Sequence, residues 1–331
     1  MDRLKVAVLG ATGIVGKELI RLLDDHPFFE IEAVYASQNS IGAVMPVSSK
    51  GHKMEVQHAE TDEISKHHFD FIFSAVSEQS ATLLERELMK NGNRIITNAS
   101  GNRMLPDVPI VVPEINFKEM SKLHNSYIIA NGNCSTIGLV LALAPLAKFI
   151  IKSVNVTTLQ AVSGAGYPGT PSMDILSNVI PYIPGEEEKL VAETHKILDP
   201  YNKHNFQLTA TCTRVPVING HMESVAVNLG SEVSLNDIVD SFSAFSNPDL
   251  PRDLPTLPDK PIIFHEEVDR PQPRLDSMNQ GKLPGMQVSV GRARISDHVL
   301  QFVLVVDNLI RGAAGSTLLN AEVAARMGGY I

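Results

Sequence analysis

One cysteine, Cys134, lies where a thiol can act as a nucleophile. It follows a short strand-like run, YIIA, and precedes a strongly apolar run, from Ile137 to Ile151, that is typical of a buried helix. Its sulfur is therefore expected at a helix N-terminus, where free amides and the helix dipole lower a thiol's pKa and favour the thiolate. The other cysteine, Cys212, lies inside the strand-like run TATCTRV and suits the alternative role of a small buried residue.

A nucleophilic thiol beside a nicotinamide cofactor indicates chemistry on an aldehyde. Attack on the aldehyde gives a thiohemiacetal, and loss of hydride to the cofactor leaves a thioester, which water, phosphate or coenzyme A can discharge. These steps need a base to manage protons. His221 is the best candidate, because it follows a tight turn at the start of a strand-like run; Arg214 precedes it on the other arm of an expected hairpin.

The spacing Gly10-x-x-Gly13-x-x-Gly16 indicates a dinucleotide site. An apolar run at 4–9 precedes the glycines and a helical pattern follows them, so the backbone can turn tightly and offer helix amides to a pyrophosphate. Thr12 adds a hydroxyl donor. A plain turn between a strand and a helix is the alternative interpretation.

The end of the second expected strand discriminates between the two nicotinamide cofactors. An acidic residue there would bind a ribose 2′-hydroxyl and repel a 2′-phosphate. This chain has Ser37-Gln38-Asn39-Ser40. The absence of an acid favours NADP, although the stretch also lacks an Arg or Lys to bind the extra phosphate.

Two structural parts with different patterns are expected to position these residues. Strand-like runs at 4–9, 31–37, 69–76 and 93–100 alternate with helical patterns, which predicts a Rossmann-type, doubly wound parallel sheet in an α/β fold. From about residue 152, long strand-like runs with few helices predict a large, mostly antiparallel sheet in an α+β catalytic and dimerisation domain.

The expected boundaries follow from this change of pattern. Residues 1–133 form the cofactor-binding domain, completed by a C-terminal helix at 314–331, and residues 134–313 form the catalytic domain. Two runs, ATCTRVPV and HMESVAVNL, are joined by Ile-Asn-Gly and are expected to form a hairpin. The proline-rich stretch 251–273 is expected to be a surface loop.

Composition narrows the class of protein. The chain has 331 residues, 44% of them hydrophobic, and a formal net charge of −9, which argues against a general nucleic-acid or membrane-surface binder. The N-terminus lacks the pattern of a signal peptide, and the run 137–151 is too short to span a membrane. Two unpaired cysteines fit a reducing compartment and predict neither a disulfide framework nor a metal site. We expect a cytoplasmic protein.

Several motifs together resemble one enzyme family. GATGIVG near the N-terminus, NGNCST around Cys134, QAVSGAGYPG at 160–169, GEEEKLVAETHKIL at 185–198 and RVPVINGH at 214–221 occur in this order through nearly the whole chain. They are similar to those of aspartate-semialdehyde dehydrogenases, in the compact branch that also includes malonyl-coenzyme A reductase. The last four motifs are specific as a set, whereas many Rossmann proteins share the first.

The resemblance implies an activity and a set of roles. It implies NADPH-dependent reduction of L-aspartyl 4-phosphate to L-aspartate 4-semialdehyde and phosphate through a thioester, in the biosynthesis of lysine, threonine, methionine and isoleucine. It implies a cytoplasmic homodimer or homotetramer without nucleic-acid or membrane partners. The catalytic residues that it implies are the nucleophile Cys134, the acid–base His221 and the positioning Gln160. The substrate-binding residues that it implies are Arg214 for the α-carboxylate, Glu186 for the ammonium, and Arg103, Lys189 and Asn133 for the phosphate.

The implied NADP site combines the glycine turn, the strand tips and two later loops. Its members are Gly10, Thr12, Gly13, Ile14, Val15, Ser37, Ser40, Ser74, Ala75, Ser163, Gly164 and Asn308. The tip at 37–40 departs from the family, because many NADP-preferring members have a basic residue there.

Three alternatives remain open from the sequence. Malonyl-coenzyme A reductase and N-acetyl-γ-glutamyl-phosphate reductase perform the same thioester chemistry, but their substrates have no positive amine for Glu186. A catalytically silent dinucleotide-binding protein is the alternative from another class. Intact Cys134, Gln160, Arg214 and His221 argue against it.

Overall fold

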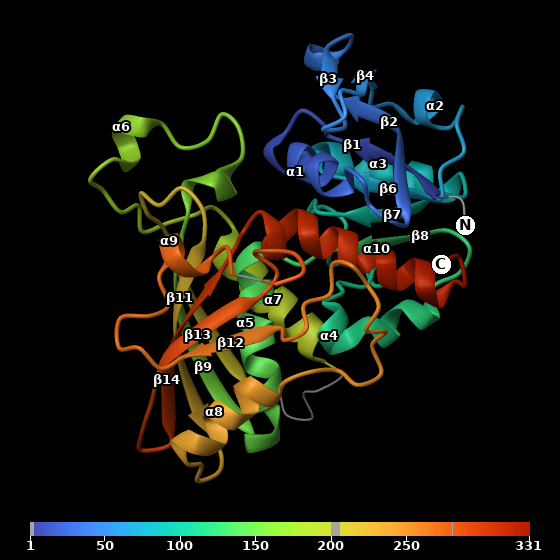
Figure 1. Cartoon of the computed structure of the whole chain (residues 1–331). Coiled ribbons are helices and arrows are strands. Elements are labelled where there is room, and N and C mark those ends of the chain that lie inside the picture. Colours follow the sequence, from blue (N-terminus) through green and yellow to red (C-terminus); the bar gives the residue numbers. More distant parts are fainter. Residues whose placement is uncertain (1–2, 200–205, 280) are drawn as a thin grey trace.

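The computed structural model of the protein describes residues 3–199, 206–279 and 281–331, which form two six-stranded sheets with helices packed against them (Figure 1). The first sheet is parallel throughout, in the order β5-β2-β1-β6-β7-β8. Its central strands are buried apolar runs, as parallel strands covered on both faces must be. Its elements are β1 (Leu4–Leu9), α1 (Ile14–Leu23), β2 (Phe29–Ala36), the hairpin of β3 (Val44–Pro46) and β4 (Lys53–Glu55), β5 (Gln57–His58), α2 (Thr61–Ile64), β6 (Phe71–Ser74), α3 (Glu78–Lys90), β7 (Arg94–Thr97), α4 (Pro113–Asn116) and β8 (Tyr127–Ala130).

The second sheet is mixed, in the order β10-β9-β11-β14-β13-β12. The three central pairs are antiparallel, whereas the edge pairs β10–β9 and β12–β13 are parallel. The expectation of a mostly antiparallel sheet is therefore confirmed, with a parallel pair added at each edge. Its elements are α5 (Cys134–Leu143), β9 (Ile151–Gln160), α6 (Ser172–Ile175), α7 (Glu186–Leu198), β10 (Gln207–Arg214), β11 (His221–Leu229), α8 (Leu235–Ala244), β12 (Ile262–His265), α9 (Pro273–Asp276), β13 (Val288–Ser296) and β14 (Val299–Val306).

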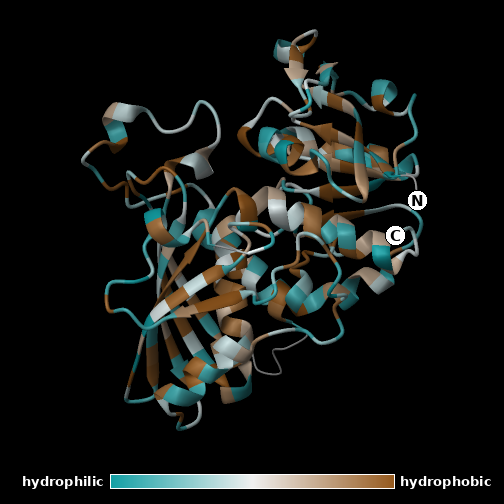
Figure 2. Cartoon of the chain, viewed as in Figure 1, coloured by the Kyte–Doolittle hydropathy of each residue, from teal (hydrophilic) through white to brown (hydrophobic). Residues whose placement is uncertain are grey.

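The two faces of the second sheet differ in polarity. The side chains that alternate along β9, β10 and β11 put an apolar row under α5 and α7 and a polar row outside. On the outer face Thr211, Thr157 and Ser224 are in register across three strands, and all three are exposed. Figure 2 shows the corresponding alternation of hydrophobic and hydrophilic residues along the strands of this sheet.

The hairpin expected between β10 and β11 is wrong. β9 lies between these strands and pairs with both, parallel to β10 and antiparallel to β11. The Ile-Asn-Gly segment belongs to a connection that passes the end of β9, where Ser163 N–H donates to the carbonyl oxygen of Ile218. The true hairpin joins β13 and β14 through Asp297 and His298, which both have positive φ, as a two-residue type I′ turn requires.

Two other stretches also differ from expectation. The proline-rich stretch 251–273 is not only a surface loop, because Leu254 and Leu257 are buried in the core of the first sheet and β12 lies within it. The apolar run 137–151 is not one helix: α5 ends at Leu143, a 3-10 helix covers Ala144–Phe149 around Pro145, and Ile151 begins β9. Proline removes a backbone donor, so the helix cannot continue through it.

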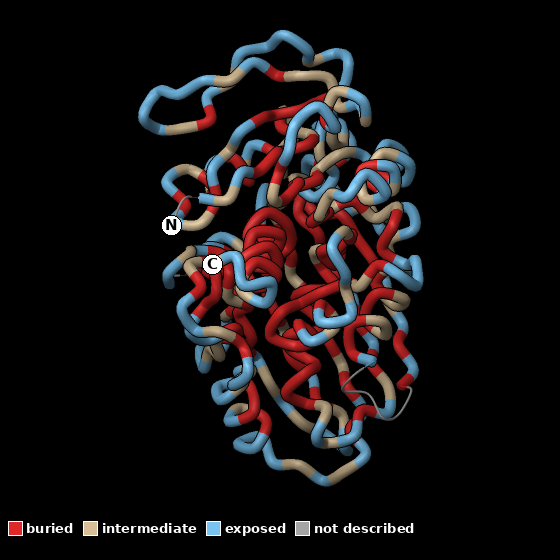
Figure 3. Tube along the Cα trace, turned by 90° about the vertical axis from the view of Figure 1, so that its right-hand side faces the viewer, coloured by how far each residue is buried: buried red, intermediate tan, exposed pale blue. Residues whose placement is uncertain are grey.

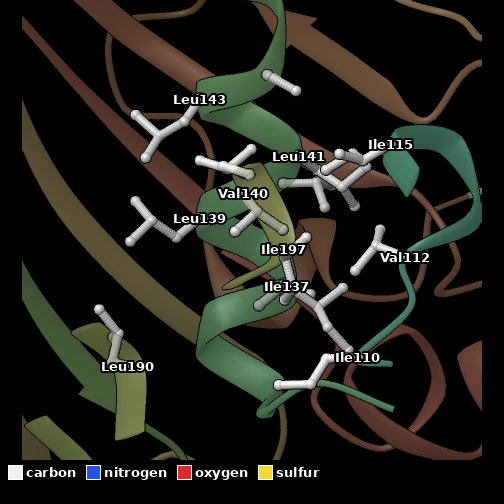
Figure 4. Close-up of a cluster of buried hydrophobic side chains, with 14 of the residues drawn as sticks. Ile110, Val112, Ile115, Ile137, Leu139, Val140, Leu141, Leu143, Leu190 and Ile197 are labelled. Atoms are coloured by element: carbon white, nitrogen blue, oxygen red, sulfur yellow. The ribbon is translucent and has the colours of Figure 1, made fainter. Parts of the chain in front are cut away.

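α5 has no exposed face. Its residues from Ser135 to Leu143 are all buried, between the second sheet, α7 and the 110–115 segment of the first half of the chain. Figure 4 shows Ile137 and Leu141 of α5 together with Ile197 of α7 and Ile110 in this cluster. The first residue of α5 is therefore fixed relative to both sheets.

The last helix, α10 (Gly315–Met327), packs against the first sheet, as the sequence predicts. Leu318, Leu319 and Val323 belong to the same buried cluster as Val6 and Phe29. Every residue of α10 from Gly315 to Ala325 is buried, and exposed residues lie mainly at the periphery of the molecule (Figure 3). Within residues 3–199, 206–279 and 281–331, no helix combines the length and apolar character needed to cross a bilayer.

Candidate active site

Cys134 is the first residue of α5, as expected. Asn133 is the N-cap, and its side-chain Oδ1 accepts hydrogen bonds from the backbone N–H groups of Ser135 and Thr136. These bonds satisfy amides that the first helical turn leaves without partners. The thiol is thus placed at the turn between β8 and α5.

The expected lowering of the Cys134 pKa is wrong. Burial, with the nearby carboxylate of Glu186 as a second cause, raises the pKa of the thiol to about 12. Arg103, Arg214 and the amide of Ser135 favour the thiolate but do not offset burial. The helix terminus was visible in the sequence, whereas the enclosure of the sulfur between two sheets was not. In the protein alone, Cys134 is a thiol at neutral pH.

Three expected site residues lie at adjoining strand ends on the inner face of the second sheet. Arg214 ends β10 in register with Gln160, which ends β9, and His221 begins the antiparallel neighbour β11. Gly164 packs against two of them: an added Cβ would lie 3.0 Å from Arg214 Nη1 and 3.0 Å from His221 Cε1. The side chains are brought together through β9, not through a hairpin.

His221 is fully buried and held in one tautomer. Its Nδ1 accepts a hydrogen bond of 3.0 Å from the backbone N–H of Ala161, so the neutral ring has its hydrogen on Nε2. Nε2 has no partner among the described residues. Burial, with Arg214 as a second cause, lowers the pKa of His221 to about 3. The ring is neutral and presents its Nε2–H as a donor, and the acid–base role of His221 stays a prediction.

Glu186, at the start of α7, collects two amide donors. Its Oε1 accepts 2.9 Å bonds from Gln160 Nε2 and from Asn133 Nδ2. Gln160 also contacts Thr158 Oγ1 at 3.3 Å, which fixes the amide group. Arg214 is buried, and its Nη1 donates to the carbonyl oxygen of Ala161 at 2.8 Å.

Two cations, Arg103 and Lys189, line the same cavity as Cys134. Arg103, from the loop after β7, is buried and pairs with Glu193 at 2.9 Å. Lys189 of α7 reaches across to Glu78 at 2.9 Å and to Ser100 at 3.3 Å. Glu186 and Lys189 lie one turn apart and face one space, as their spacing predicts.

A cavity of about 460 Å³ joins these groups to the glycine turn of the first sheet. A larger cavity of about 830 Å³ lies beside the edge strand β8 and contains none of the predicted site residues. Of the predicted residues, those that line the smaller cavity are Gly13, Ile14, Val15, Ala75, Arg103, Asn133, Cys134, Ser163, Gly164, Glu186, Lys189 and Asn308.

The glycine turn fits a dinucleotide pyrophosphate. Gly10 has a φ of 76°, and an added Cβ would lie 2.4 Å from the carbonyl oxygen of Ala75. An added Cβ at Gly16 would lie 2.1 Å from the Gly10 oxygen, so this glycine lets α1 approach the strand. Gly13 caps α1 without any side-chain bond, which leaves the first helical amides to an anion. Nothing larger than glycine is accommodated at Gly10 and Gly16.

The remaining predicted cofactor residues lie around this turn. Thr12 Oγ1 is 3.3 Å from Ser40 Oγ, and Ser37 precedes the short 3-10 helix Gln38–Ser40 at the tip of β2. Ser74 ends β6, and its buried hydroxyl has no partner among the described residues. Asn308 Nδ2 donates to Ser163 Oγ at 2.8 Å and so links the two later loops.

Three residues at the site were missed by the sequence reasoning. Glu193 accepts hydrogen bonds from the Arg103 guanidinium and from the backbone N–H of Asn133. Gly312, in a π-helical turn before α10, packs on Cys134: an added Cβ would lie 2.5 Å from the Cys134 Cβ. Glu223 is fully buried two residues after His221, neither of its carboxylate oxygens has a partner among the described residues, and burial raises its pKa well above the ordinary value. Only the position of Glu193 inside AETHKIL offered a signal.

No group of three or more metal-binding side chains occurs in the part of the chain that the structure describes. The arrangement therefore combines a thiol, a neutral imidazole donor, an amide, two cations and a glycine cradle. It is suited to acyl transfer to sulfur next to a bound dinucleotide.

Two family models match most of the chain. Residues 5–123 match the model described as "Semialdehyde dehydrogenase, NAD binding domain", and residues 143–311 match "Semialdehyde dehydrogenase, dimerisation domain". Among curated proteins, the chain is 38% identical to the aspartate-semialdehyde dehydrogenase of Archaeoglobus fulgidus, over 97% of this chain and 98% of that protein. It is 40% identical to the enzyme of the same name from Methanothermobacter thermautotrophicus, over 96% and 98%.

Solved structures agree with these matches. The crystal structure of aspartate semialdehyde dehydrogenase with NADP from Candida albicans superposes with a TM-score of 0.84, at 32% identity and over all of both chains. That of aspartate semialdehyde dehydrogenase II complexed with ASA from Vibrio cholerae has a TM-score of 0.82, at 27% identity, and covers 98% of this chain and 99% of that one. The resemblance found in the sequence and the α/β fold are both confirmed.

The pKa of Cys134 predicts how its alkylation depends on pH. Because the thiolate fraction rises with pH below the pKa, modification of the protein alone by iodoacetamide should accelerate about tenfold per pH unit from roughly pH 7 to 10. Mass spectrometry of the alkylated peptide measures the rate, and a Cys134→Ala variant gives the contribution of Cys212. A rate that levels off below about pH 9 would show a far more acidic thiol.

The contact between Gly312 and Cys134 predicts that Gly312→Ala loses stability, by an amount that depends on the side chain at position 134. Gly312→Ala should lower the free energy of unfolding by about 1–3 kcal/mol, because the new methyl group overlaps the Cys134 Cβ. Urea unfolding measures the change. Gly132→Ala, whose added Cβ meets only side-chain ends at 3.2 Å and beyond, is the matched control and should cost less. In a Cys134→Gly background most of the Gly312→Ala cost should vanish; an undiminished cost would refute the contact.

Proposed function

The chain belongs to the aspartate-semialdehyde dehydrogenase family, and we propose that it reduces L-aspartyl 4-phosphate to L-aspartate 4-semialdehyde through a thioester on Cys134. This activity belongs to amino-acid biosynthesis. The observation that carries the proposal is the single cavity in which Cys134, Lys189, Arg103 and the glycine turn meet.

The groups around Glu186 support an amino-acid substrate. Both amide donors contact the same oxygen, Oε1, which leaves the other carboxylate oxygen for the substrate ammonium. Arg214, two strands from His221, binds the α-carboxylate through its guanidinium fork. Malonyl and N-acetylated substrates have no positive amine, so neither would use this carboxylate.

The phosphate end is bound by the two cations that share the cavity with Cys134. Arg103 and Lys189 hold the acyl phosphate, and Asn133, beside the nucleophile, assists them. Cys134 attacks this carbon, the carbon–oxygen bond to phosphate breaks, and the thiol proton leaves with the phosphate dianion. Because the phosphate carries the proton away, the step can begin from the protonated thiol of Cys134.

His221 stabilises the negative oxygen that forms on the reacting carbon. Its Nε2–H is a fixed donor, because Nδ1 is held by the Ala161 amide. A donor that is oriented before the reaction stabilises developing charge without reorganisation. Gln160, in register with Arg214, fixes the acyl group between them.

NADP is the cofactor, and in its reduced form, NADPH, it would supply the hydride that reduces the thioester. Gly10, Gly13 and the free amides of α1 hold the pyrophosphate, and Ser37 with Ser40 lies where a 2′-phosphate would bind. The relative from Candida albicans was solved with NADP. We divide the chain into a cofactor-binding domain at 1–133 completed by 314–331, and a catalytic domain at 134–313.

The protein acts as an assembly of identical chains. A loop at 166–184, which carries α6, stands away from the body of the molecule (Figure 1) and exposes large apolar side chains. Such a surface, together with the open polar face of the second sheet, is suited to a second copy of the chain. The apolar residues concerned are Tyr167, Met173, Leu176, Val179 and Tyr182, exposed by 53–85%.

The free cysteines bear on where the enzyme works. Cys134 and Cys212 are both unpaired, and the proposed chemistry needs Cys134 reduced. A reducing compartment is required, so we propose the cytoplasm.

The activity itself predicts a specific pair of assays. Purified protein should reduce NADP with L-aspartate 4-semialdehyde only when phosphate is present, and should not oxidise NADPH with malonyl-coenzyme A. Absorbance of NADPH measures both reactions. Cys134→Ala should abolish turnover because no thioester can form, while leaving the Kd for NADPH nearly unchanged. Activity with malonyl-coenzyme A alone would keep the Cys134 chemistry and reject the aspartyl substrate.

The exposed loop predicts the subunit arrangement. The wild-type chain should sediment as a dimer or tetramer, and a Met173→Asp/Val179→Asp variant should shift towards the monomer, because burying two carboxylates at the contact is costly. Analytical ultracentrifugation at several concentrations measures this. The control is Val268→Asp, at an exposed site in another loop, which should leave the mass unchanged. A monomeric wild-type chain would contradict the proposal.

A further inference from the structure

One buried carboxylate contacts both the nucleophile turn and a phosphate-binding cation. α7 carries Glu186, Lys189, Glu193 and Lys196 at spacings of three and four residues, which place them along one side of the helix. The first two line the active-site cavity. Glu193 lies one turn further on, is 1% exposed, and has no role in the proposed chemistry.

The two oxygens of Glu193 have different partners. Oε1 accepts a 2.9 Å bond from Arg103 Nη1, and Oε2 accepts a 2.6 Å bond from the backbone N–H of Asn133. Both partners are donors, so only a group with two acceptor oxygens satisfies them. An amide would face one donor with its own N–H.

These partners come from the two halves of the active site. Asn133 is the N-cap of α5 and directly precedes Cys134. Arg103 comes from the loop after β7 of the first sheet, where its Nη2 also donates to the carbonyl oxygen of Asn98 at 2.6 Å. One carboxylate therefore fixes the spacing between the nucleophile's backbone and the guanidinium.

The loop that bears Arg103 has a second, independent anchor. Lys196 Nζ donates to the carbonyl oxygens of Arg103, Leu105 and Val108 at 2.6–2.9 Å. Loss of the Glu193 carboxylate therefore leaves the loop attached to α7 and releases only the Arg103 guanidinium and the backbone N–H of Asn133. Glu193 therefore orients these two groups.

We propose that Glu193 is a positioning residue that sets the distance between the Cys134 nucleophile and Arg103, the proposed phosphate-binding group. The inference rests on the proposed function of the site. It explains why a cation meant for a substrate is already paired: the pair holds the guanidinium in place, and its remaining donors address the phosphate.

Glu193→Gln tests the proposal through the separation of kinetic constants. In phosphate-dependent NADP reduction, the KM for phosphate should rise about tenfold and kcat should fall at least about tenfold, because displacement near the chemistry is costly. The KM for NADP should stay within about twofold, since the glycine turn is untouched. A purely structural role would lower the melting temperature without selecting phosphate.

Two further variants make the result decisive. Glu187→Gln, on the same helix, is the matched control. The Oε1 of Glu187 accepts the Cys212 N–H, which an amide oxygen can also accept, so the kinetics of this variant should match the wild type. Glu193→Asp keeps the charge and both acceptors on a shorter arm, so it folds if Gln does not, and its phosphate KM should be intermediate.

The possible outcomes separate this inference from the proposed function. If the wild type is active but Glu193→Gln and Glu193→Asp both have the same phosphate KM as Glu187→Gln, the proposed role of Glu193 is overturned and the proposed function stands. An inactive wild type would reject the function instead. In that case the alkylation rate of Cys134 still reports on the turn: Glu193→Gln must change it relative to Glu187→Gln, and equal rates count against the proposal.

Discussion

Burial of α5 on every side is the constraint on which the site depends. A helix without an exposed face needs every terminal amide satisfied from within the protein, and Asn133 does this for the first turn. Once the helix start is fixed in this way, Cys134 has one position relative to both sheets. The ends of β9, β10 and β11 then present their side chains to that point, and the glycine turn faces it from the other sheet.

The junction between the sheets is held by buried charges as well as apolar contacts. Arg311, just before α10, makes a two-bond pair with Glu114 of α4, and both are almost completely buried. Arg103 and Glu193 form a second buried pair nearer the nucleophile. Pairs of this kind contribute little net stability, because both ions lose their water. Their value lies in alignment, since a charge left without its partner is strongly unfavourable.

The sequence predicted those parts of the structure that local patterns determine. The β1, glycine-turn and α1 order, the position of Cys134 at a helix start and the return of α10 to the first sheet each follow from residues close together in the chain. The insertion of β9 between β10 and β11 did not follow from local patterns. β9 ends at Gln160, well before β10 begins at Gln207 and β11 begins at His221, and the pattern of neither neighbour identifies its partner strand. The Ile-Asn-Gly turn signal was real but belonged to a longer connection.

The electrostatics of the site were predictable only in part for the same reason. The type and order of the ionisable residues are in the sequence, but their burial is a property of the assembled sheets. Cys134 has the helix terminus that lowers a thiol pKa and the enclosure that raises it, and enclosure wins. Gly312 and Glu193 reach the nucleophile from 178 and 59 positions away, so no local pattern could assign them to it.

The path of the chain also affects how the protein is made. The first sheet is synthesised early, yet Leu318, Leu319 and Val323 of α10 complete its core. Domains generally begin to fold on the ribosome in the order of synthesis. Here the core of the first sheet stays incomplete, with apolar surface uncovered, until α10 has been synthesised. The sheet whose strands come first in the sequence is therefore completed only after every strand of the second sheet has been made.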